Sequence, residues 1–150
     1  MEAVHNPGIT IPCRTISFSM REDVLFCLLP SGRELNYPRP VIKPGRFGAA
    51  QVTFLDMEAG RQRGKQMYGG KWAENVISAV ARDLLVEAMK RLRAAGYALV
   101  LHTHDEIVAE MPAGRGSEVE FHRLLTEVPG WARDLPIAAK VFEADRLKKD

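Results

Sequence analysis

The sequence has no stretch that approaches 18 consecutive apolar residues, so nothing in it predicts a helix that spans a membrane. Its first eight residues, MEAVHNPG, lack the charged, then apolar, then small-residue order of a signal peptide. Only two residues are cysteine, Cys13 and Cys27, and they lie in separate apolar segments without CxxC spacing. We therefore expect a cytoplasmic protein with no membrane partner and with buried thiols in a reducing compartment, although a cross-strand cysteine pair stays open.

Net charge is also small, at +2, so overall charge alone does not indicate a nucleic-acid-binding protein. The charge is unevenly spread, because six Lys or Arg residues in positions 39–65 stand against Asp56 and Glu58. The basic residues are Arg39, Lys43, Arg46, Arg61, Arg63 and Lys65. Both a solvated loop surface and a patch that faces phosphate groups are consistent with this run.

Short apolar runs separated by proline and glycine fill the first 67 residues. We expect strands over residues 14–20, 23–30, 33–38 and 49–56, because each run is too short for a helix and suits a hairpin. The separating residues are Pro30, Gly32, Pro38, Pro40, Pro44, Gly45 and Gly60. Residues 1–67 are interpreted as a β-rich hairpin region and residues 68–150 as a segment of different character, together forming one compact unit.

The second segment opens with the strongest periodic pattern in the chain. Apolar residues recur at the three- and four-residue spacing of one helical face, and no Pro or Gly interrupts residues 71–95. These apolar residues are Ala73, Val76, Ile77, Val80, Ala81, Leu84, Leu85, Ala88 and Leu92. Gly96 follows at the position where a residue in the left-handed conformation commonly ends a helix.

Beyond that helix, the pattern predicts a hairpin, a second helix and a last strand. The hairpin consists of strands over residues 97–103 and 106–111, joined by a turn. Ser117 followed by Glu120 has capping-box spacing and predicts a helix start. That helix is expected to turn Val119, Leu124 and Leu125 inward, and residues 136–142 are expected to form the last strand.

The predicted order of the second segment, αββαβ, makes the fold class α+β. One strand in front would complete a split βαβ, ferredoxin-like sheet with two helices on one face. The expected architecture is therefore an incomplete palm-type sheet that follows an N-terminal β-hairpin region.

His104, Asp105 and Glu106 place three ionisable residues at the centre of the predicted hairpin. Because burial of such groups costs several kcal/mol without compensation, a turn open to solvent or to a metal ion is the natural setting. Mg²⁺ takes hard oxygen ligands, and two-ion nucleotidyl transfer needs carboxylates from two chain segments. Taken alone, the triplet favours a solvated connection.

Four polar residues on the long helix, Lys71, Asn75, Ser78 and Arg82, are spaced i, i+4, i+7 and i+11. This spacing aligns them in one stripe opposite the apolar face. Every amphipathic helix has a polar face, so the stripe by itself indicates only exposure to solvent.

Residues 68–112, YGGKWAENVISAVARDLLVEAMKRLRAAGYALVLHTHDEIVAEMP, resemble the C-terminal palm of family A (polymerase I type) DNA polymerases, most closely the phage-type members. In that family a long helix precedes a hairpin whose turn carries HDE, called motif C. Looser similarity extends to residues 29–40 and 124–142, so nearly the whole chain is covered. The resemblance implies a phage-derived palm segment over residues 68–150, preceded by a β insertion over residues 1–67, in a bacterial or phage-infected cell.

Carried over by position, Asp105 matches the metal-binding aspartate of motif C, and Glu106 matches its acidic neighbour. The resemblance thus implies catalytic and Mg²⁺-binding roles for Asp105 and Glu106. His104 matches the histidine that contacts the primer strand near its 3′ end.

The polar stripe of the helix also has counterparts in the family. Asn75 matches an asparagine that faces the minor groove of the primer-template, and Lys71 lies where many members have arginine. Ser78 and Arg82 extend this DNA-facing stripe, but many members carry Gln near Ser78, and serine is too short for the same reach. Because minor-groove acceptors differ little between base pairs, Lys and Asn would read duplex shape rather than sequence.

Two parts of the family's site do not occur in these 150 residues. They are motif A, an Asp followed by Tyr-Ser and an Ile-Glu pair, and the fingers helix whose Arg, Lys and Tyr bind the triphosphate. We therefore expect the chain to be inactive alone, and to act on primer-template DNA and dNTPs in DNA replication when a complementing chain supplies them.

Two alternatives stay open for a chain without these parts. It could be a non-catalytic remnant that binds duplex DNA or a partner protein. It could also form a homodimer that pairs the sheet edges exposed by the missing strand.

Overall fold

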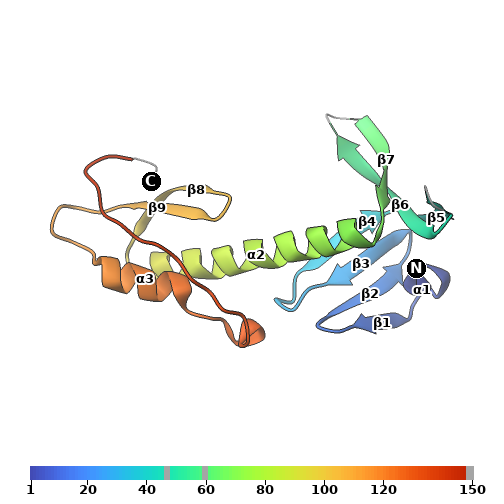
Figure 1. Ribbon diagram of the computed structural model, residues 1–150, viewed down its shortest axis with the longest axis horizontal. Helices are drawn as coiled ribbons and strands as arrows, with labels where there is room; N and C mark the ends of the chain where they lie inside the picture. Colours follow the sequence, from blue (N-terminus) through green and yellow to red (C-terminus); the bar gives the residue numbers. More distant parts are fainter. Residues whose placement is uncertain (46–47, 59–60, 148–150) are drawn as a thin grey trace. The chain divides into compact units, whose positions relative to one another are not determined.

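The computed structural model describes residues 1–45, 48–58 and 61–147 of the chain. The chain forms two compact units, Met1–Val80 and Ala81–Asp150. The expected α+β class is confirmed, because helices combine with separate antiparallel sheets (Figure 1). The sequence-based division after Met67 coincides with the end of a strand, whereas the first unit extends into the long helix that follows.

The first unit contains one short helix and two antiparallel sheets, followed by the start of the long helix. The first sheet has the order β1-β2-β3-β4 and follows helix α1: α1 (Glu2–His5), β1 (Thr10–Cys13), β2 (Ile16–Arg21), β3 (Val24–Leu28) and β4 (Glu34–Pro38). The second sheet has the order β5-β6-β7: β5 (Val41–Pro44), β6 (Ala50–Glu58) and β7 (Arg61–Met67). Helix α1 and strands β1, β5 and β7 were not predicted from the sequence.

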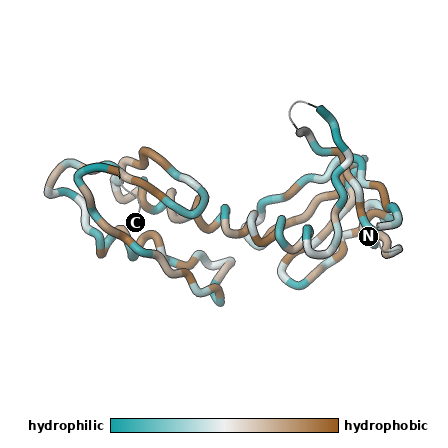
Figure 2. The backbone as a smooth tube through the Cα atoms, turned by 45° about the horizontal axis from the view of Figure 1, so that its top comes forward, coloured by the Kyte–Doolittle hydropathy of each residue, from teal (hydrophilic) through white to brown (hydrophobic). Residues whose placement is uncertain are grey.

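A single apolar core holds the first unit together. Its buried members are Ala3, Met20, Leu25, Cys27, Leu29, Tyr37, Phe54 and Met67, drawn from α1, both sheets and the loop after β3. Trp72 and Val76 of the long helix pack against this core, and Tyr37 contacts Trp72 edge to face at a centroid distance of 4.6 Å. Figure 2 shows the contrast within this unit, since β7 is hydrophilic along most of its length.

The long helix, α2 (Gly69–Ala94), agrees closely with the range predicted from the sequence. It ends as expected, because Gly96 has a φ of 89° and the Tyr97 amide donates to the Leu92 carbonyl at 3.0 Å. Leu92 is fully buried, but Ile77 is 67% exposed, which corrects its placement in the apolar face. Ile77 lies about 100° around the helix from Val76, outside the side that packs on the sheet.

The same correction applies to two alanines of the predicted apolar face, Ala73 and Ala81, which are both exposed. Successive residues of an α-helix turn by about 100°, so the side that meets a sheet is narrower than the predicted stripe. The spacing therefore identified the helix correctly but overestimated how much of it is covered.

The second unit contains the rest of α2, a hairpin and two further helices. The elements are β8 (Ala98–Thr103), β9 (Glu106–Glu110), α3 (Glu118–Thr126) and a 3-10 helix, η1 (Gly130–Ala132). Leu92, Tyr97 and Leu124 form its buried core. The predicted start of α3 is confirmed, because the Glu120 amide donates to the Ser117 hydroxyl at 3.4 Å.

Two expectations for this unit are wrong. Residues 136–142 form no strand, and among the described residues of this unit the sheet consists of β8 and β9 alone. Val119 is 80% exposed, because it lies five residues from Leu124 and therefore on a different side of α3.

The two cysteines differ in their surroundings. Cys27 is fully buried in the first core, but Cys13 is exposed at the end of β1, an outer strand of its sheet, which corrects its predicted burial. Both thiols are free. No helix within the described residues is long and apolar enough to cross a membrane.

Candidate nucleic-acid interface and metal-binding turn

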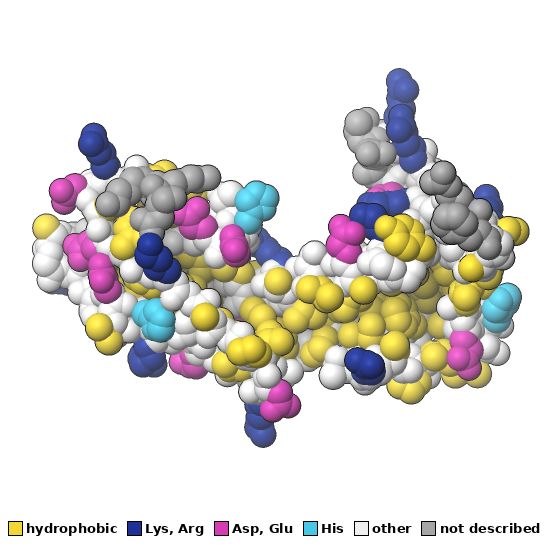
Figure 3. Space-filling model, viewed as in Figure 1, with side chains coloured by type: hydrophobic (Ala, Val, Ile, Leu, Met, Phe, Trp, Pro, Cys, Tyr) yellow, Lys and Arg dark blue, Asp and Glu magenta, His cyan; other side chains and the backbone are white. Residues whose placement is uncertain are grey.

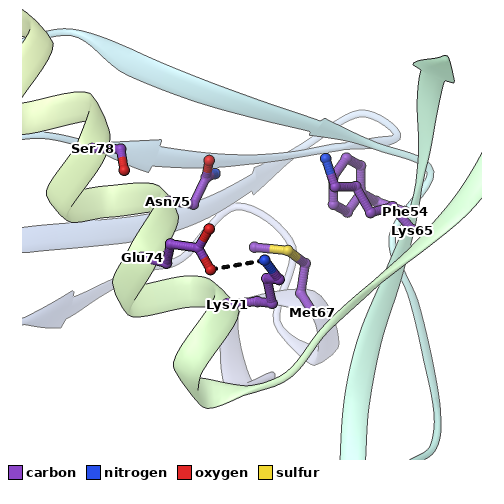
Figure 4. Close-up of a pocket in the computed structure, with 7 residues that line it drawn as sticks. All are labelled: Phe54, Lys65, Met67, Lys71, Glu74, Asn75 and Ser78. Atoms are coloured by element: carbon purple, nitrogen blue, oxygen red, sulfur yellow. Dashed lines mark hydrogen bonds and ion pairs between the residues drawn. The ribbon is translucent and has the colours of Figure 1, made fainter. Parts of the chain in front are cut away.

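A cavity of about 110 Å³ separates the first turns of α2 from the β6–β7 hairpin within the first unit (Figure 4). Its lining residues are Phe54, Lys65, Met67, Lys71, Glu74, Asn75 and Ser78. Three residues of the predicted polar stripe, Lys71, Asn75 and Ser78, thus come together at one hollow. The hollow is smaller than the roughly 300 Å³ of small ligand sites, so it suits contact with the edge of a larger molecule.

Lys71 is held by an ion pair with its neighbour on the helix. Its Nζ lies 2.8 Å from Glu74 Oε2, and the Lys71 and Glu74 side chains are 43% and 63% exposed. The hydrogen bond that Lys71 donates to Glu74, and then the negative charge of Glu74, raise the pKa of Lys71. Because the pair is exposed, it contributes little to stability and can open when a competing anion arrives.

Asn75 connects the same surface to the core beneath it. Its Nδ2 donates a hydrogen bond of 2.6 Å to the hydroxyl of Tyr37, a residue that is 2% exposed. Burial raises the pKa of Tyr37 to about 12, so the hydroxyl stays neutral. The bond fixes one side of the Asn75 amide, and no sequence signal indicated it because the two residues are 38 positions apart.

The hairpin supplies residues that the polar stripe did not include. Lys65 of β7 lies in the basic run, and its Nζ is 2.9 Å from Asp56 Oδ2 on the paired strand. Phe54 and Glu74 lack any distinguishing sequence pattern, and only the fold brings them to the cavity. Of the other residues named in the sequence, Arg46 and Gly60 lie outside the described residues.

Arg82 belongs to the second unit and contacts β8. Its Nη1 lies 3.2 Å from Nδ1 of His102. Because a guanidinium can only donate, the ring nitrogen accepts this bond. Arg82 thus connects α2 to the strand that leads into the HDE turn.

The HDE turn is a two-residue connection between β8 and β9. Thr103 pairs with Glu106, which leaves His104 and Asp105 as the turn residues. Both are exposed, Glu106 is half-buried, and His104 has a φ of 52°. This conformation is costly for a residue with a side chain and usually favours glycine. The predicted turn at His104 and Asp105 is confirmed.

Asp105 has no hydrogen bond or ion pair within the described part of the chain. Its carboxylate and that of Glu106 offer the hard oxygen atoms that Mg²⁺ prefers. Within residues 1–45, 48–58 and 61–147, however, no three His, Cys, Asp or Glu residues gather into a metal site. The donor set therefore fits a contribution to a magnesium site rather than a complete one.

Comparison with known proteins finds a phage relative. The chain is 38% identical over 137 residues to a protein named DNA polymerase from Bacillus phage SP02. The match covers 90% of this chain but 21% of that protein, so the chain spans about a fifth of its relative's length. No protein-family model and no solved structure matches. The resemblance to a phage DNA polymerase is thereby confirmed, and the chain is homologous to a segment of that protein.

Proposed function

We propose that the chain is the part of a phage-type family A DNA polymerase that carries motif C, acting in DNA replication in a bacterial or phage-infected cell. One observation carries this proposal. A free, exposed Asp105 lies at the tip of a hairpin that follows a long helix, in a segment homologous to a phage polymerase. An acidic residue in a two-residue turn is unremarkable alone, but this order of helix, hairpin and HDE is specific.

Asp105 is the proposed metal ligand, and Glu106 is its accessory ligand or a group that orients it. Mg²⁺ bound there would neutralise charge on the primer 3′ oxygen and on the α-phosphate of the incoming deoxynucleotide. The chain's own contribution is positioning, because the short turn holds the Asp105 carboxylate clear of the packed core. His104 is proposed to contact the primer end from the same turn.

The polar side of α2 is proposed to contact the primer-template. Lys71 would exchange its exposed Glu74 partner for a phosphate or a minor-groove acceptor. Asn75 keeps one amide hydrogen on Tyr37 and retains a second for a base edge. Ser78 and Arg82 continue this polar stripe, although Arg82 contacts His102 in the free chain.

The second carboxylate segment is proposed to come from a complementing chain with motif A and the fingers. The two-stranded β8–β9 sheet supports the need for a partner strand. Val100 and Leu101 of β8 are 56% and 45% exposed, so apolar surface is available beside an open ladder. Alone, the chain is proposed to be inactive.

Primer extension with a complementing polymerase fragment tests the proposal. The chain, the fragment, Mg²⁺, dNTPs and primer-template should together extend the primer, whereas neither protein should do so alone. Asp105→Ala should abolish extension, and Asp134→Ala, which removes another exposed aspartate of the same unit, should not. Primer extension that survives Asp105→Ala would contradict the assignment of Asp105 as a metal ligand.

A non-catalytic DNA-binding role is the second candidate, and the cationic cavity supports it. It predicts metal-independent, salt-sensitive duplex binding that Lys71→Ala weakens and Asp105→Ala leaves unchanged. The open sheet edge also allows a homodimer. Light scattering after size exclusion decides this point, because a clean monomer excludes it.

A further inference from the structure

An exposed aromatic side chain lies at the start of α2. Tyr68 is 57% exposed, and its carbonyl accepts a hydrogen bond of 3.0 Å from the Trp72 amide. Nearby aromatic residues behave differently, because Tyr37 and Phe54 are buried in the core of the unit and Trp72 packs against it. Figure 3 shows hydrophobic side chains exposed beside basic and acidic ones where Figure 1 places the start of α2 next to β7. Tyr68 is therefore a large ring that the core does not use.

The ring of Tyr68 lies against the backbone of the first turn of α2. A methyl group at Gly70 would come within 2.9 Å of Cε2 and 3.5 Å of Cδ2 of this ring, and the first distance is shorter than carbon atoms pack. A methyl group at Gly69 would meet no atom within 4 Å in the described part of the chain, its immediate neighbours aside. Because glycine is a poor helix former, the contact with Tyr68 gives a reason for glycine at position 70 that position 69 does not share.

Tyr68 adjoins the polar side of α2. It directly follows Met67, which lines the cavity, and it lies three residues before Lys71, a spacing that brings side chains together on a helix surface. Glu74 first, and Tyr68 to a lesser extent, raise the pKa of Lys71, which indicates that the phenol lies near this ammonium group. An accessible aromatic ring thus stands beside the hydrogen-bond donors of Lys71 and Asn75.

This combination suits a nucleotide whose base is unpaired. Every nucleobase has a π-face that can stack on an aromatic ring, and polar or cationic groups beside the ring can hold the sugar-phosphate chain. A base inside a duplex has both faces covered by its neighbours, so it offers no face to Tyr68. A purely structural explanation is that the ring shields the helix backbone at Gly70 from solvent.

We propose that Tyr68 stacks on an unpaired base of the primer-template, at the point where the single strand leaves the duplex that lies along α2. The inference rests on the proposed function and adds to it a contact with single-stranded DNA. Such a contact does not depend on base identity, since the ring recognises the π-face rather than the hydrogen-bonding edge.

Binding of the full chain to two fluorescent DNAs tests this inference. Both are duplexes with a single-stranded 5′ overhang, and in the second every overhang base is replaced by an abasic residue, so the phosphate charge is the same. Tyr68→Ala should lower the affinity for the intact overhang by roughly fivefold to a hundredfold and leave the affinity for the abasic overhang unchanged. Tyr68→Phe should keep both wild-type affinities, because stacking needs the ring rather than the hydroxyl.

The two glycines supply a matched pair of variants that keep the ring. Gly70→Ala should displace the ring and weaken binding to the intact overhang, whereas Gly69→Ala should bind as the wild-type chain does. Alanine favours a helix at both positions, so both variants should stay folded, which circular dichroism checks. If Tyr68→Ala does not fold, this pair still decides the question.

Wild-type affinity of Tyr68→Ala for the intact overhang would overturn the inference, and so would a wild-type chain that binds both overhangs equally or not at all. Equal losses in the two glycine variants would indicate an effect of the helix start rather than of the ring, with the same consequence. A lower melting temperature of Tyr68→Ala with unchanged DNA affinity would assign the ring to shielding the backbone instead. The polymerase proposal would survive each of these results, because complemented primer extension with Asp105→Ala tests it separately.

Discussion

The two regions with predicted site residues differ in how their polar groups are satisfied. At the cavity in the first unit, Lys71 is paired with Glu74 and Asn75 with Tyr37. At the turn of the second unit, Asp105 has no partner within the described residues. One region therefore holds its side chains in place before any ligand arrives, and the other presents a free carboxylate.

This contrast suits two different kinds of ligand. A duplex is a large partner that gains from a side chain such as Asn75, whose orientation the bond to Tyr37 already fixes, because less entropy is lost on binding. A metal ion instead needs an anionic oxygen that no internal cation has neutralised. The contrast predicts that substitution of Asn75 changes stability and DNA binding together, whereas substitution of Asp105 changes activity alone.

The largest expected effect is at the turn. Asp105→Asn keeps the shape of the side chain and removes its charge, so complemented primer extension should fall by about 10² to 10³. Thermal stability should not change, because the carboxylate has no internal partner to lose. A lower melting temperature would show that Asp105 has a structural role, and would contradict the contrast between the paired side chains at the cavity and the free carboxylate at the turn.

The next effect concerns the core beneath the cavity at alkaline pH. Burial first, and then the nearby Cys13, raise the pKa of Cys27 from 9.0 to about 11. Because the folded pKa exceeds the unfolded one, the stabilisation is present below pH 9 and is lost as pH rises toward 11. Chemical denaturation should show a loss of about 2–3 kcal/mol over this range. Cys27→Ala should remove the part of this loss that begins near pH 9, whereas Cys13→Ala should largely preserve it.

Breaking the bond between the helix and the core should have an asymmetric effect. Asn75→Ala leaves the buried Tyr37 hydroxyl without a partner and should lower the free energy of unfolding by about 1–3 kcal/mol. Tyr37→Phe should cost less, because water can solvate the exposed Asn75 amide. The double variant should recover part of the loss from Asn75→Ala, and simple additivity would contradict the proposed bond.

A smaller effect is expected where His104 has a positive φ. His104→Gly allows the turn to keep its left-handed conformation without the steric cost of a side chain. The free energy of unfolding should therefore rise by up to about 1 kcal/mol. Complemented primer extension should nevertheless fall, since the proposed primer contact is lost. Full activity in this variant would leave no functional reason for histidine at this turn position.

The smallest expected effect is a gain in duplex affinity rather than a loss. Glu74→Gln frees Lys71 and removes a negative charge from the cavity, so duplex affinity should rise by about two- to threefold. Glu87→Gln is the matched control, because Glu87 and Lys90 form another i,i+3 pair at 2.8 Å in the second unit. A parallel gain in both variants would indicate a general charge effect rather than one at the cavity.

Unequal success in predicting the two regions follows from the range of the interactions. The HDE turn was predictable because Thr103 and Glu106 pair across two residues, so local sequence sets its geometry. The environment of Asn75 was not predictable, because its partner Tyr37 belongs to strand β4, 38 positions earlier in the chain. Lys65 was noticed only as part of a basic run, and its approach to Lys71 depends on how β7 folds against α2.

The sequence by itself determined the long helix, the Ser117 start of α3 and the α+β class, because spacing and capping act within a few residues. Tertiary structure alone decided that residues 136–142 form no strand and that Ile77 and Val119 face solvent. It also decided which polar side chains are already paired. The physical reason is that burial and pairing depend on surfaces from distant parts of the chain, whereas periodicity records only which face of an element could be buried.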